Sequence, residues 1–412
     1  MKIAQINMTP YGSTGKIMLQ IAQTAQSFGH NVACFTTEIF SVEGRKTRVK
    51  APNLFYYGSF YENMIHNYLG KLFGLNGFFS YFGTKQLIKK LKKFSPDIVH
   101  LHNLHSFCIN LPVLFKYLRK SGVQVVWTLH DCWAFTGHCA HFTLVGCEKW
   151  KAKCYKCPQI KAYPKSYIDS SKTMYDYKRK LFTSIKNLLF VTPSQWLADL
   201  LKQSFLKDYP VEVINNGVDL SIFKPQPGDF RKQYGISEDK FILLGVAFDW
   251  GKRKGLDVFI ELSKRLDEDK FQIVLVGTDD NADKQLPKNI ISIHRTQNQM
   301  QLAEIYTAAD LFVNPTREDN YPTVNIESIA CGTPIVTFNT GGSPECIDES
   351  CGSVVPYDDN EALCKEIIRI CERRPFSKEN CLQRAKSFDM KEKFKEYIKL
   401  YEDCSHSSKL PV

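Results

Sequence analysis

The chain has no uninterrupted apolar run of about 18 residues, the length that a membrane-spanning helix needs. Its amino terminus, MKIAQINMTPYG, also lacks the basic and then apolar layout of a secretory signal. We therefore expect a cytoplasmic protein without a membrane span. The sequence shows neither an internal repeat nor a low-complexity tract.

The two common phosphate-binding motifs are missing as well. The turn GSTG at residues 12–15 is neither a G-x-G-x-x-G fingerprint nor a P-loop, since no Gly-Lys-Ser/Thr follows it. It still supplies flexible backbone and amides at a helix start, which suits a phosphate or the close approach of a substrate. An ordinary tight strand-to-helix turn explains it equally well.

Disulfides are not expected either, although the chain has 14 cysteines. Scattered cysteines in a cytoplasmic enzyme are buried apolar residues or metal ligands. The formal net charge of +11 implies attraction to anions, which include nucleic acid, nucleotide phosphates and an acidic lipid surface.

The 412 residues exceed what one core usually holds, so two domains are expected. Short apolar runs alternate with helical patterns in both halves, which predicts two doubly wound α/β domains facing across a cleft. We expect domain 1–218, domain 219–387 and a final helix and tail at 388–412, which would pack back on the first domain. The expected strands are 2–6, 32–35, 97–101, 123–128, 188–192, 211–214, 241–246, 271–276, 290–293, 311–314 and 335–338, and the expected helices are 16–28, 255–266, 299–308, 325–330 and 361–372.

The segment NPTREDNYPTVNIESIACGTP at residues 314–334 carries the strongest signal. It follows a short apolar strand and continues as a helix, with Asp319 in the loop and Glu327 in the first turns. The backbone amides of Tyr321, Thr323 and Val324 lie between these acids. A helix start attracts anions, because its first N–H groups lack partners inside the helix and its dipole is positive there.

A second candidate site follows the strand in VVWTLHDC, where His130 and Asp131 emerge at the carboxyl end. Doubly wound folds keep their chemistry at this edge, and an adjacent acid can fix the tautomer of a histidine. The alternative is that His130 has only a structural role, with its ring nitrogens hydrogen-bonded inside the protein. His102 and His105 also end a strand and are weaker candidates, because their spacing is poor for a metal site on an extended chain.

The loop 138–158 contains four closely spaced cysteines. A Cys-x2-Cys pair in a long loop with little apolar material is typical of a structural zinc site. Four unliganded thiols are the alternative, and His138 and His141 are substitute ligands. The candidate ligands are Cys139, Cys147, Cys154 and Cys157.

Aromatic residues between positions 55 and 82 precede a lysine-rich amphipathic helix, TKQLIKKLKKF, at residues 84–94. Aromatics beside a basic amphipathic helix are typical of a protein that sits on an anionic membrane, which would place the protein peripherally on the inner face of the plasma membrane. Ordinary core packing and a solvated helix face compete with this interpretation.

Lys252, Arg253 and Lys254 form a basic loop between the first strand and the first helix of the second half. A similar glycine-rich turn occurs at residues 339–345. Amides and cations hold phosphates, and carboxylates accept hydrogen bonds from sugar hydroxyls. Together these groups favour a nucleotide diphosphate that carries a hydroxylated group, and a solvated basic loop is the alternative.

These motifs resemble those of glycosyltransferase family 4, which are retaining enzymes with the GT-B fold. The signature there is Glu, seven residues, Glu and then an A-C-G-x-P turn, and Asp319 here fills the first Glu position. The resemblance also covers GSTG, T-x-H-D at 128–131, T-P-S at 192–194, N-G-V-D at 216–219, K-G at 254–255 and G-G-x-P-E at 341–345. The cysteine loop is similar to that of a subset of bacterial polysaccharide glycosyltransferases.

The resemblance implies a role for each matching residue. Glu327 would bind the donor ribose, Asp319 or its neighbour Glu318 would approach the transferred sugar, and His130 would contact that sugar. Gly15 would lie near the diphosphate and acceptor. Lys254 and Arg253 would hold the diphosphate, and because the family's G-R-L run is absent, Arg253 or Lys252 is expected to supply the missing charge.

The implied function is transfer of a sugar from a nucleotide-diphosphate donor to a glycan or lipid-linked acceptor in cell-surface polysaccharide synthesis, without Mg²⁺. A GT-B-like sugar-nucleotide epimerase is the alternative. A zinc-containing nucleic-acid-binding protein is a remote alternative, because the basic residues do not form one face with interleaved aromatics, and no nucleic-acid partner is expected.

Overall fold

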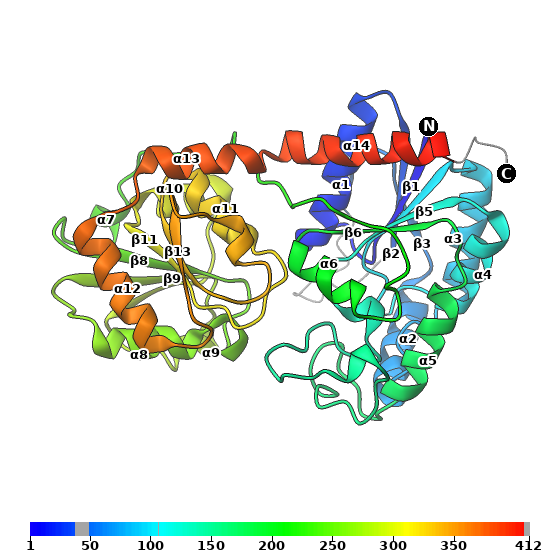
Figure 1. Ribbon diagram of the computed structural model, residues 1–412, viewed down its shortest axis with the longest axis horizontal. Helices are drawn as coiled ribbons and strands as arrows, with labels where there is room; N and C mark the ends of the chain where they lie inside the picture. The colour runs from blue at the N-terminus through cyan, green and yellow to red at the C-terminus, as the bar shows by residue number, and fades with distance from the viewer. Residues whose placement is uncertain (38–48, 106, 408–412) are drawn as a thin grey trace. The chain divides into compact units, whose positions relative to one another are not determined.

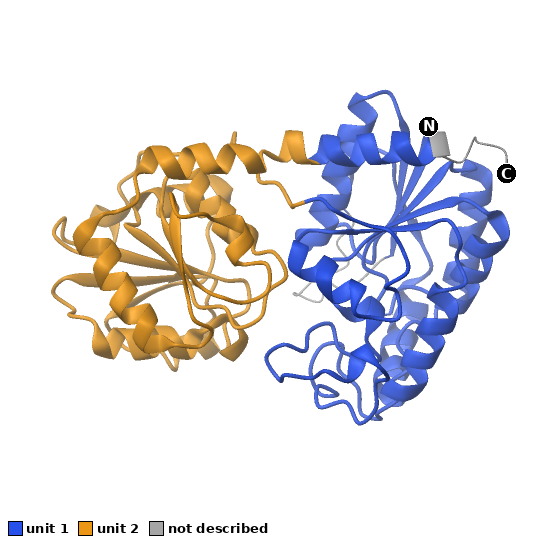
Figure 2. Cartoon of the chain, in the orientation of Figure 1, with its two compact units in different colours: residues 1–214, 394–412 blue, residues 215–393 orange. Residues whose placement is uncertain are grey.

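The computed structural model describes residues 1–37, 49–105 and 107–407. The chain forms two compact units, with residues 1–214 and 394–412 in unit 1 and residues 215–393 in unit 2 (Figure 2). In the part of the chain that the structure describes, every helix is too short or too polar to span a lipid bilayer.

Unit 1 contains a parallel sheet with the strand order β3-β2-β1-β4-β5-β6-β7. Every strand pair in it is parallel, so each connection crosses over the sheet, and helices cover both faces (Figure 1). The strands are β1 (Lys2–Ile6), β2 (Asn31–Thr37), β3 (Leu54–Tyr57), β4 (Ile98–Leu101), β5 (Gln124–Thr128), β6 (Leu188–Thr192) and β7 (Val211–Val213). The helices are α1 (Gly12–Ser27), α2 (Phe60–Phe73), α3 (Tyr81–Phe94), α4 (Leu111–Ser121), α5 (Ser171–Phe182), α6 (Gln195–Lys202) and most of α14 (Met390–Ser407).

Unit 2 repeats this plan with the parallel strand order β10-β9-β8-β11-β12-β13. One apolar cluster packs α10 and α11 on one face of the sheet, and a second packs α8 and α12 on the other. The strands are β8 (Phe241–Val246), β9 (Phe271–Val276), β10 (Ile290–Ile293), β11 (Leu311–Asn314), β12 (Ile335–Phe338) and β13 (Gly352–Val355). The helices are α7 (Phe230–Gln233), α8 (Leu256–Arg265), α9 (Asp280–Asp283), α10 (Gln299–Ala308), α11 (Thr323–Ala330), α12 (Asn360–Arg373) and α13 (Lys378–Ala385).

The sequence-based expectations missed two strands, β3 and β13, which lie at the edges of their sheets. No strand was expected in the aromatic run that begins at Phe55, but its first residues form β3. Edge strands need only one paired neighbour, so their sequences carry a weaker pattern of burial. The exposure pattern of β3 shows this, because only Tyr57 is fully buried.

The final helix, α14, runs from Met390 to Ser407, and most of it belongs to unit 1. The Tyr401 hydroxyl hydrogen-bonds to His100 Nδ1 (2.7 Å), and the Tyr397 hydroxyl lies 3.3 Å from Thr128 Oγ1. His100 Nε2 and Thr128 Oγ1 are also hydrogen-bonded (2.8 Å). The helix therefore satisfies buried polar groups on β4 and β5.

Candidate functional site

In each sheet, the loops that follow one pair of neighbouring strands lead to opposite sides of the sheet, and this place is called the switch point. These switch points lie between β1 and β4 in unit 1 and between β8 and β11 in unit 2. Ligands of doubly wound folds bind at the carboxyl ends of the strands at such points. The candidate residues predicted from the sequence follow these strands or their neighbours.

The loops after β1 and β4 are joined by Asn7, whose Oδ1 accepts from the N–H of Asn103 (3.1 Å). Its Nδ2 donates to the Thr9 carbonyl (3.0 Å) and closes the turn before α1. Gly15 faces this turn so closely that an added Cβ would lie 2.4 Å from the Pro10 carbonyl carbon. Gly15 is thus required for packing, whether or not it also approaches a ligand.

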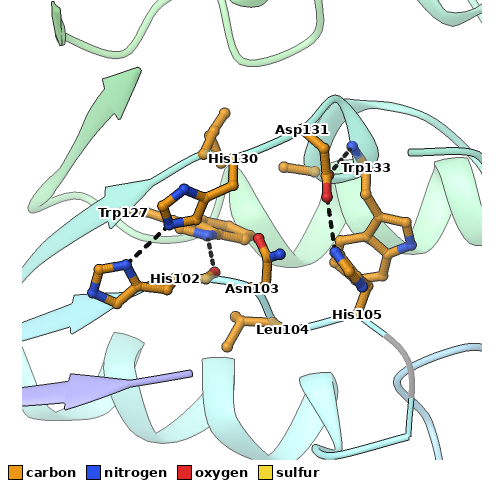
Figure 3. Close-up of a pocket in the computed structure, with 10 residues that line it drawn as sticks. His102, Asn103, Leu104, His105, Trp127, His130, Asp131 and Trp133 are labelled. Carbon is orange, nitrogen blue, oxygen red and sulfur yellow. Dashed lines mark hydrogen bonds and ion pairs between the residues drawn. The ribbon is translucent and has the colours of Figure 1, made fainter. Parts of the chain in front are cut away.

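His130 and Asp131 emerge after β5, beside the end of β4, and line one pocket with His102 and His105 (Figure 3). His130 Nε2 lies 3.2 Å from His102 Nδ1. Asp131 binds His105 Nε2 through Oδ2 (2.8 Å) and accepts from the N–H of Trp133 through Oδ1 (2.8 Å). The structure therefore pairs each candidate of the HD motif with one of the two weaker histidine candidates.

Burial sets the charge of these groups. It lowers the pKa of His130 to about 4, against an opposing effect of Asp131. Burial alone would raise the pKa of Asp131, but His105, His141 and the N–H of Trp133 bring it to about 2. At neutral pH this pocket contains a neutral His130 imidazole and an ionised Asp131 carboxylate.

In unit 2, the ammonium group of Lys254 forms an ion pair with Asp319. Lys254 ends a short 3₁₀ helix, η3 (Lys252–Lys254), that follows β8, and Asp319 lies in the loop after β11. Arg253 donates from Nη1 to the Glu318 carbonyl (3.2 Å). The side chain of Lys252 is exposed, and that of Glu318 is buried.

Arg317, which the sequence analysis missed, holds this loop in place. Its guanidinium makes a bidentate ion pair with Asp257 (2.7 and 2.9 Å) and binds Asp358 through Nε (2.6 Å). Its backbone N–H donates to the Arg253 carbonyl (2.9 Å). The loop that carries Asp319 is therefore anchored on η3 by both backbone and side chain.

The start of α11 is fixed by Asn325, which is fully buried. Its Oδ1 accepts from Asn314 Nδ2 (2.7 Å), and its Nδ2 donates to Ser343 Oγ (2.9 Å). This side chain ties the end of β11 to the glycine-rich turn after β12. Thr323 and Val324 form the first turn of α11, which begins two residues before its expected start at residue 325.

Glu327 lies in the second turn of α11 and is partly exposed. The hydroxyl of Tyr306 donates to its Oε2 (3.2 Å). Tyr306 comes from α10 and is fully buried, so it fixes one carboxylate oxygen without covering the group. The Tyr321 side chain is also buried.

The four candidate zinc ligands line a single cavity in unit 1, together with His138. The Cys139 thiol hydrogen-bonds to Cys157, which raises the pKa of Cys139 and lowers that of Cys157. The N–H of Gly137 donates to Cys154 Sγ (3.2 Å). Among the residues with described positions, however, no three His, Cys, Asp or Glu side chains are arranged to hold a metal ion.

Lys178 on α5 is a second residue that the sequence analysis missed. It is fully buried beside the cysteine loop, where Nζ donates to the Trp133 carbonyl (2.7 Å) and the Thr136 carbonyl (3.1 Å). Burial lowers its pKa to about 7, against the opposing effect of Cys154 and Cys139. The buried amine thus lies close to the thiols of the cysteine loop.

Two models of protein families match the sequence. The model described as Glycosyltransferase Family 4 matches residues 14–222, just over half of the 412 residues, and the model described as Glycosyl transferases group 1 matches residues 238–373. Among curated proteins, the chain is similar to WcaC of Escherichia coli (strain K12), named as a colanic acid biosynthesis glycosyl transferase. The identity is 28% over 278 residues, which cover 64% of this chain and 65% of WcaC, slightly less than two thirds of that relative.

Solved structures share the fold. Sucrose-phosphate synthase from Thermosynechococcus elongatus has a TM-score of 0.71 at 18% identity, with 98% of this chain and 99% of that chain covered. HepE of Anabaena, solved in complex with UDP-glucose, has a TM-score of 0.66 at 16% identity, with 98% and 100% covered. The predicted α/β architecture, two doubly wound domains of the GT-B class, is confirmed.

The lowered pKa of the buried His130 imidazole predicts how the free energy of unfolding depends on pH. The pKa of His130 is lowered to about 4 from the ordinary value of 6.5, so the unfolded chain binds more protons between these values. The stabilisation is present above pH 6.5 and is lost as the pH falls toward 4. His130→Gln should flatten this fall by up to about 1.4 kcal/mol per pH unit, measured by urea unfolding.

The matched control is His294→Gln, since the pKa of the exposed His294 is raised by Asp283 instead of lowered. This variant should not flatten the pH dependence. Equal slopes for His130→Gln and the unmodified protein would contradict the assignment of His130 as a buried neutral imidazole.

Proposed function

Because the chain belongs to glycosyltransferase family 4, as its motifs predicted, we propose that it is a retaining glycosyltransferase. It moves a sugar from a nucleoside diphosphate donor to a hydroxyl of a growing glycan or lipid-linked acceptor. Cell-surface polysaccharide synthesis is the supported context, because WcaC is named for colanic acid. UDP sugars are the first donors to test, because HepE was solved in complex with UDP-glucose.

The observation that carries this proposal is the group of charges at the switch point of unit 2. Lys254 and Asp319 form an ion pair there, and the loop that carries Asp319 leads into the amino-terminal turn of α11. The ammonium group and the helix amides provide positive charge for a diphosphate. The partly exposed Glu327 carboxylate provides acceptors for ribose hydroxyls, with one oxygen already oriented by Tyr306.

The reaction is a substitution on one face of the sugar. The bond between the anomeric carbon and the diphosphate oxygen breaks, and the acceptor oxygen forms the new bond on the same face. The departing diphosphate takes the proton of the acceptor hydroxyl. The protein contributes position and charge: Lys254 and Arg253 stabilise the leaving diphosphate, His130 and Asp319 contact the sugar, and no divalent metal is required.

Removal of the charged groups tests this assignment. Lys254→Ala and Glu327→Ala should each lower sugar transfer at least about 100-fold, the usual effect of losing a group that stabilises developing charge. The measurement is nucleotide release from a panel of nucleotide sugars with a glycan acceptor mixture. Circular dichroism checks that each variant is folded.

Lys264→Ala is the matched control, because it removes an exposed lysine from the last turn of α8. It should retain full activity. Near-normal turnover in folded Lys254→Ala or Glu327→Ala would contradict the proposed donor site. Conversion of the donor sugar to its epimer without any acceptor would favour the epimerase instead.

We propose that the four cysteines around the thiol cavity bind a structural zinc ion, although their side chains would have to draw together to do so. Zinc prefers thiolates in closed four-ligand sites, and Cys139, Cys147, Cys154 and Cys157 all line this cavity. The Nε2 atom of His138, in the same cavity, is buried without a hydrogen-bond partner in the described structure. Such an ion would stabilise the loop 138–158 and would leave no position for catalysis.

Metal analysis of the purified protein tests the zinc site. We expect about one zinc per chain, and loss of most of it in Cys154→Ser/Cys157→Ser. Cys364→Ser, in α12 of unit 2, is the control and should retain the metal. A metal content far below one per chain in the unmodified protein would refute the site.

Helix α2 supports binding to an anionic membrane surface. Its exposed side chains Tyr61, Met64, Ile65 and Tyr68 follow the spacing i, i+3, i+4 and i+7, so they form one apolar stripe that faces solvent. Phe82 and several lysines of α3 are exposed too, and the N–H of Phe82 donates to Glu62 in the first turn of α2 (2.8 Å). An apolar stripe beside cations suits the boundary of an anionic bilayer at the cytoplasmic face.

Vesicle sedimentation at low and high salt tests this surface. The protein should bind phosphatidylglycerol vesicles at low salt and dissociate as salt screens the attraction. Tyr61→Ser/Tyr68→Ser and Lys89→Glu/Lys93→Glu should both weaken binding. Lys264→Glu/Lys270→Glu makes the same charge change in unit 2 and should leave binding intact, and failure of the unmodified protein to bind at low salt would refute the proposal.

A further inference from the structure

Gln5, on β1, is fully buried between helix α1 and the ring of His102. Only one orientation of its carboxamide satisfies these neighbours. In that orientation Nε2 donates to the Met18 carbonyl (3.2 Å) and to His102 Nε2 (2.9 Å), while Oε1 accepts from the N–H of Ala22 (3.2 Å). The reverse orientation would place oxygen against the carbonyl and N–H against N–H, so the backbone of α1 decides which way the amide points.

The orientation of Gln5 fixes the tautomer of His102. Burial keeps the imidazole of His102 neutral by lowering its pKa well below the ordinary value, so one ring nitrogen carries a proton and the other accepts. Because Nε2 accepts from Gln5, the proton of His102 is on Nδ1. Two hydrogen bonds hold the backbone of His102 in place: its N–H donates to the Ile6 carbonyl (2.9 Å), and the indole Nε1 of Trp127 donates to its carbonyl (2.9 Å).

The same reasoning extends to His130. His102 Nδ1 lies 3.2 Å from His130 Nε2, and the two ring planes are nearly parallel, with an angle of 14° between them (Figure 3). Since the proton of this hydrogen bond belongs to His102, His130 Nε2 accepts it. A neutral His130 then carries its own proton on Nδ1, so any hydrogen bond through that atom is one that His130 donates.

We propose that Gln5 and His102 are positioning residues that hold His130 in the tautomer protonated on Nδ1, so that it donates a hydrogen bond to an oxygen of the donor sugar. This inference rests on the proposed glycosyltransferase function for the identity of the ligand. The series of hydrogen bonds from α1 through Gln5 and His102 to His130, which we call the relay, lies within unit 1. Through it the backbone of α1 selects which nitrogen of His130 carries the proton. Neither Gln5 nor the direction of the hydrogen bond was visible in the HD motif.

Nuclear magnetic resonance of the unmodified protein with ¹⁵N-labelled histidine tests the relay directly. The chain has ten histidines, and the signals that disappear in His130→Gln identify His130. We expect a protonated, pyrrole-type Nδ1 and an unprotonated, pyridine-type Nε2 at neutral pH. A His130 ring that is protonated on Nε2 would overturn the inference without any other variant.

Gln5→Met tests the first step of the relay, because methionine keeps the length of the side chain and removes both amide groups. We expect the two His130 tautomers to mix and kcat/KM for sugar transfer to fall roughly fivefold, the effect of one weakened neutral hydrogen bond. Ile3→Val, also buried on β1, is the matched control and should leave the tautomer unchanged. A tautomer that stays fixed in Gln5→Met, or that mixes equally in Ile3→Val, would overturn the role of Gln5.

The two proposals fail in different ways. The predicted tautomer without any sugar transfer from the donor panel would refute the glycosyltransferase function and leave the relay in place. Sugar transfer with His130 protonated on Nε2 would refute the relay alone.

Discussion

A parallel sheet ends all its strands at one edge, and this constraint organises the chemistry of both units. The loops after β1 and β4 meet through Asn7, and the loops after β8 and β11 meet through Lys254 and Asp319. At the switch point the two connections leave toward opposite faces, so neither helix covers the strand ends. The residues available for binding are therefore those that immediately follow the central strands, which is why short motifs spread along the chain converge in each unit.

Burial gives these groups their chemical character. His130 and His102 lie where the charged form of an imidazole is poorly solvated, so they act as neutral donors and acceptors instead of as cations. Asp131 keeps its charge because hydrogen bonds and nearby histidines outweigh its desolvation. Lys178 is the opposite case, an amine whose charge burial disfavours and whose neighbours are thiols. The protonation states of the titratable side chains near the strand ends of unit 1 therefore depend on how deeply each is buried and on its neighbours, as well as on residue type.

The sequence was informative where the signal is local. The pattern of strand and polar motif predicted that His130 and Asp131 would follow the carboxyl end of a strand, which is where they lie after β5, and most central strands agree with their expected limits within a few residues. It was uninformative where a partner comes from far along the chain. Tyr306 reaches Glu327 across 21 positions, and Gln5 reaches His102 across 97. Such pairs form only when distant elements pack together. The periodicity and residue spacing within one segment do not predict that packing.

Three backbones approach one another closely around Asp319. Gly341 adopts φ +56°, and a Cβ there would lie 1.7 Å from the Asp319 carbonyl oxygen, so only glycine lets the turn after β12 come this near. From the other side, the N–H of Arg317 binds the carbonyl of Arg253 in η3. The backbone at Asp319 is thereby fixed between the turn after β12 and η3. From this position the Asp319 side chain forms its ion pair with Lys254. The main chain therefore places Asp319 opposite Lys254, and Gly341 permits the backbone contact that holds Asp319 there.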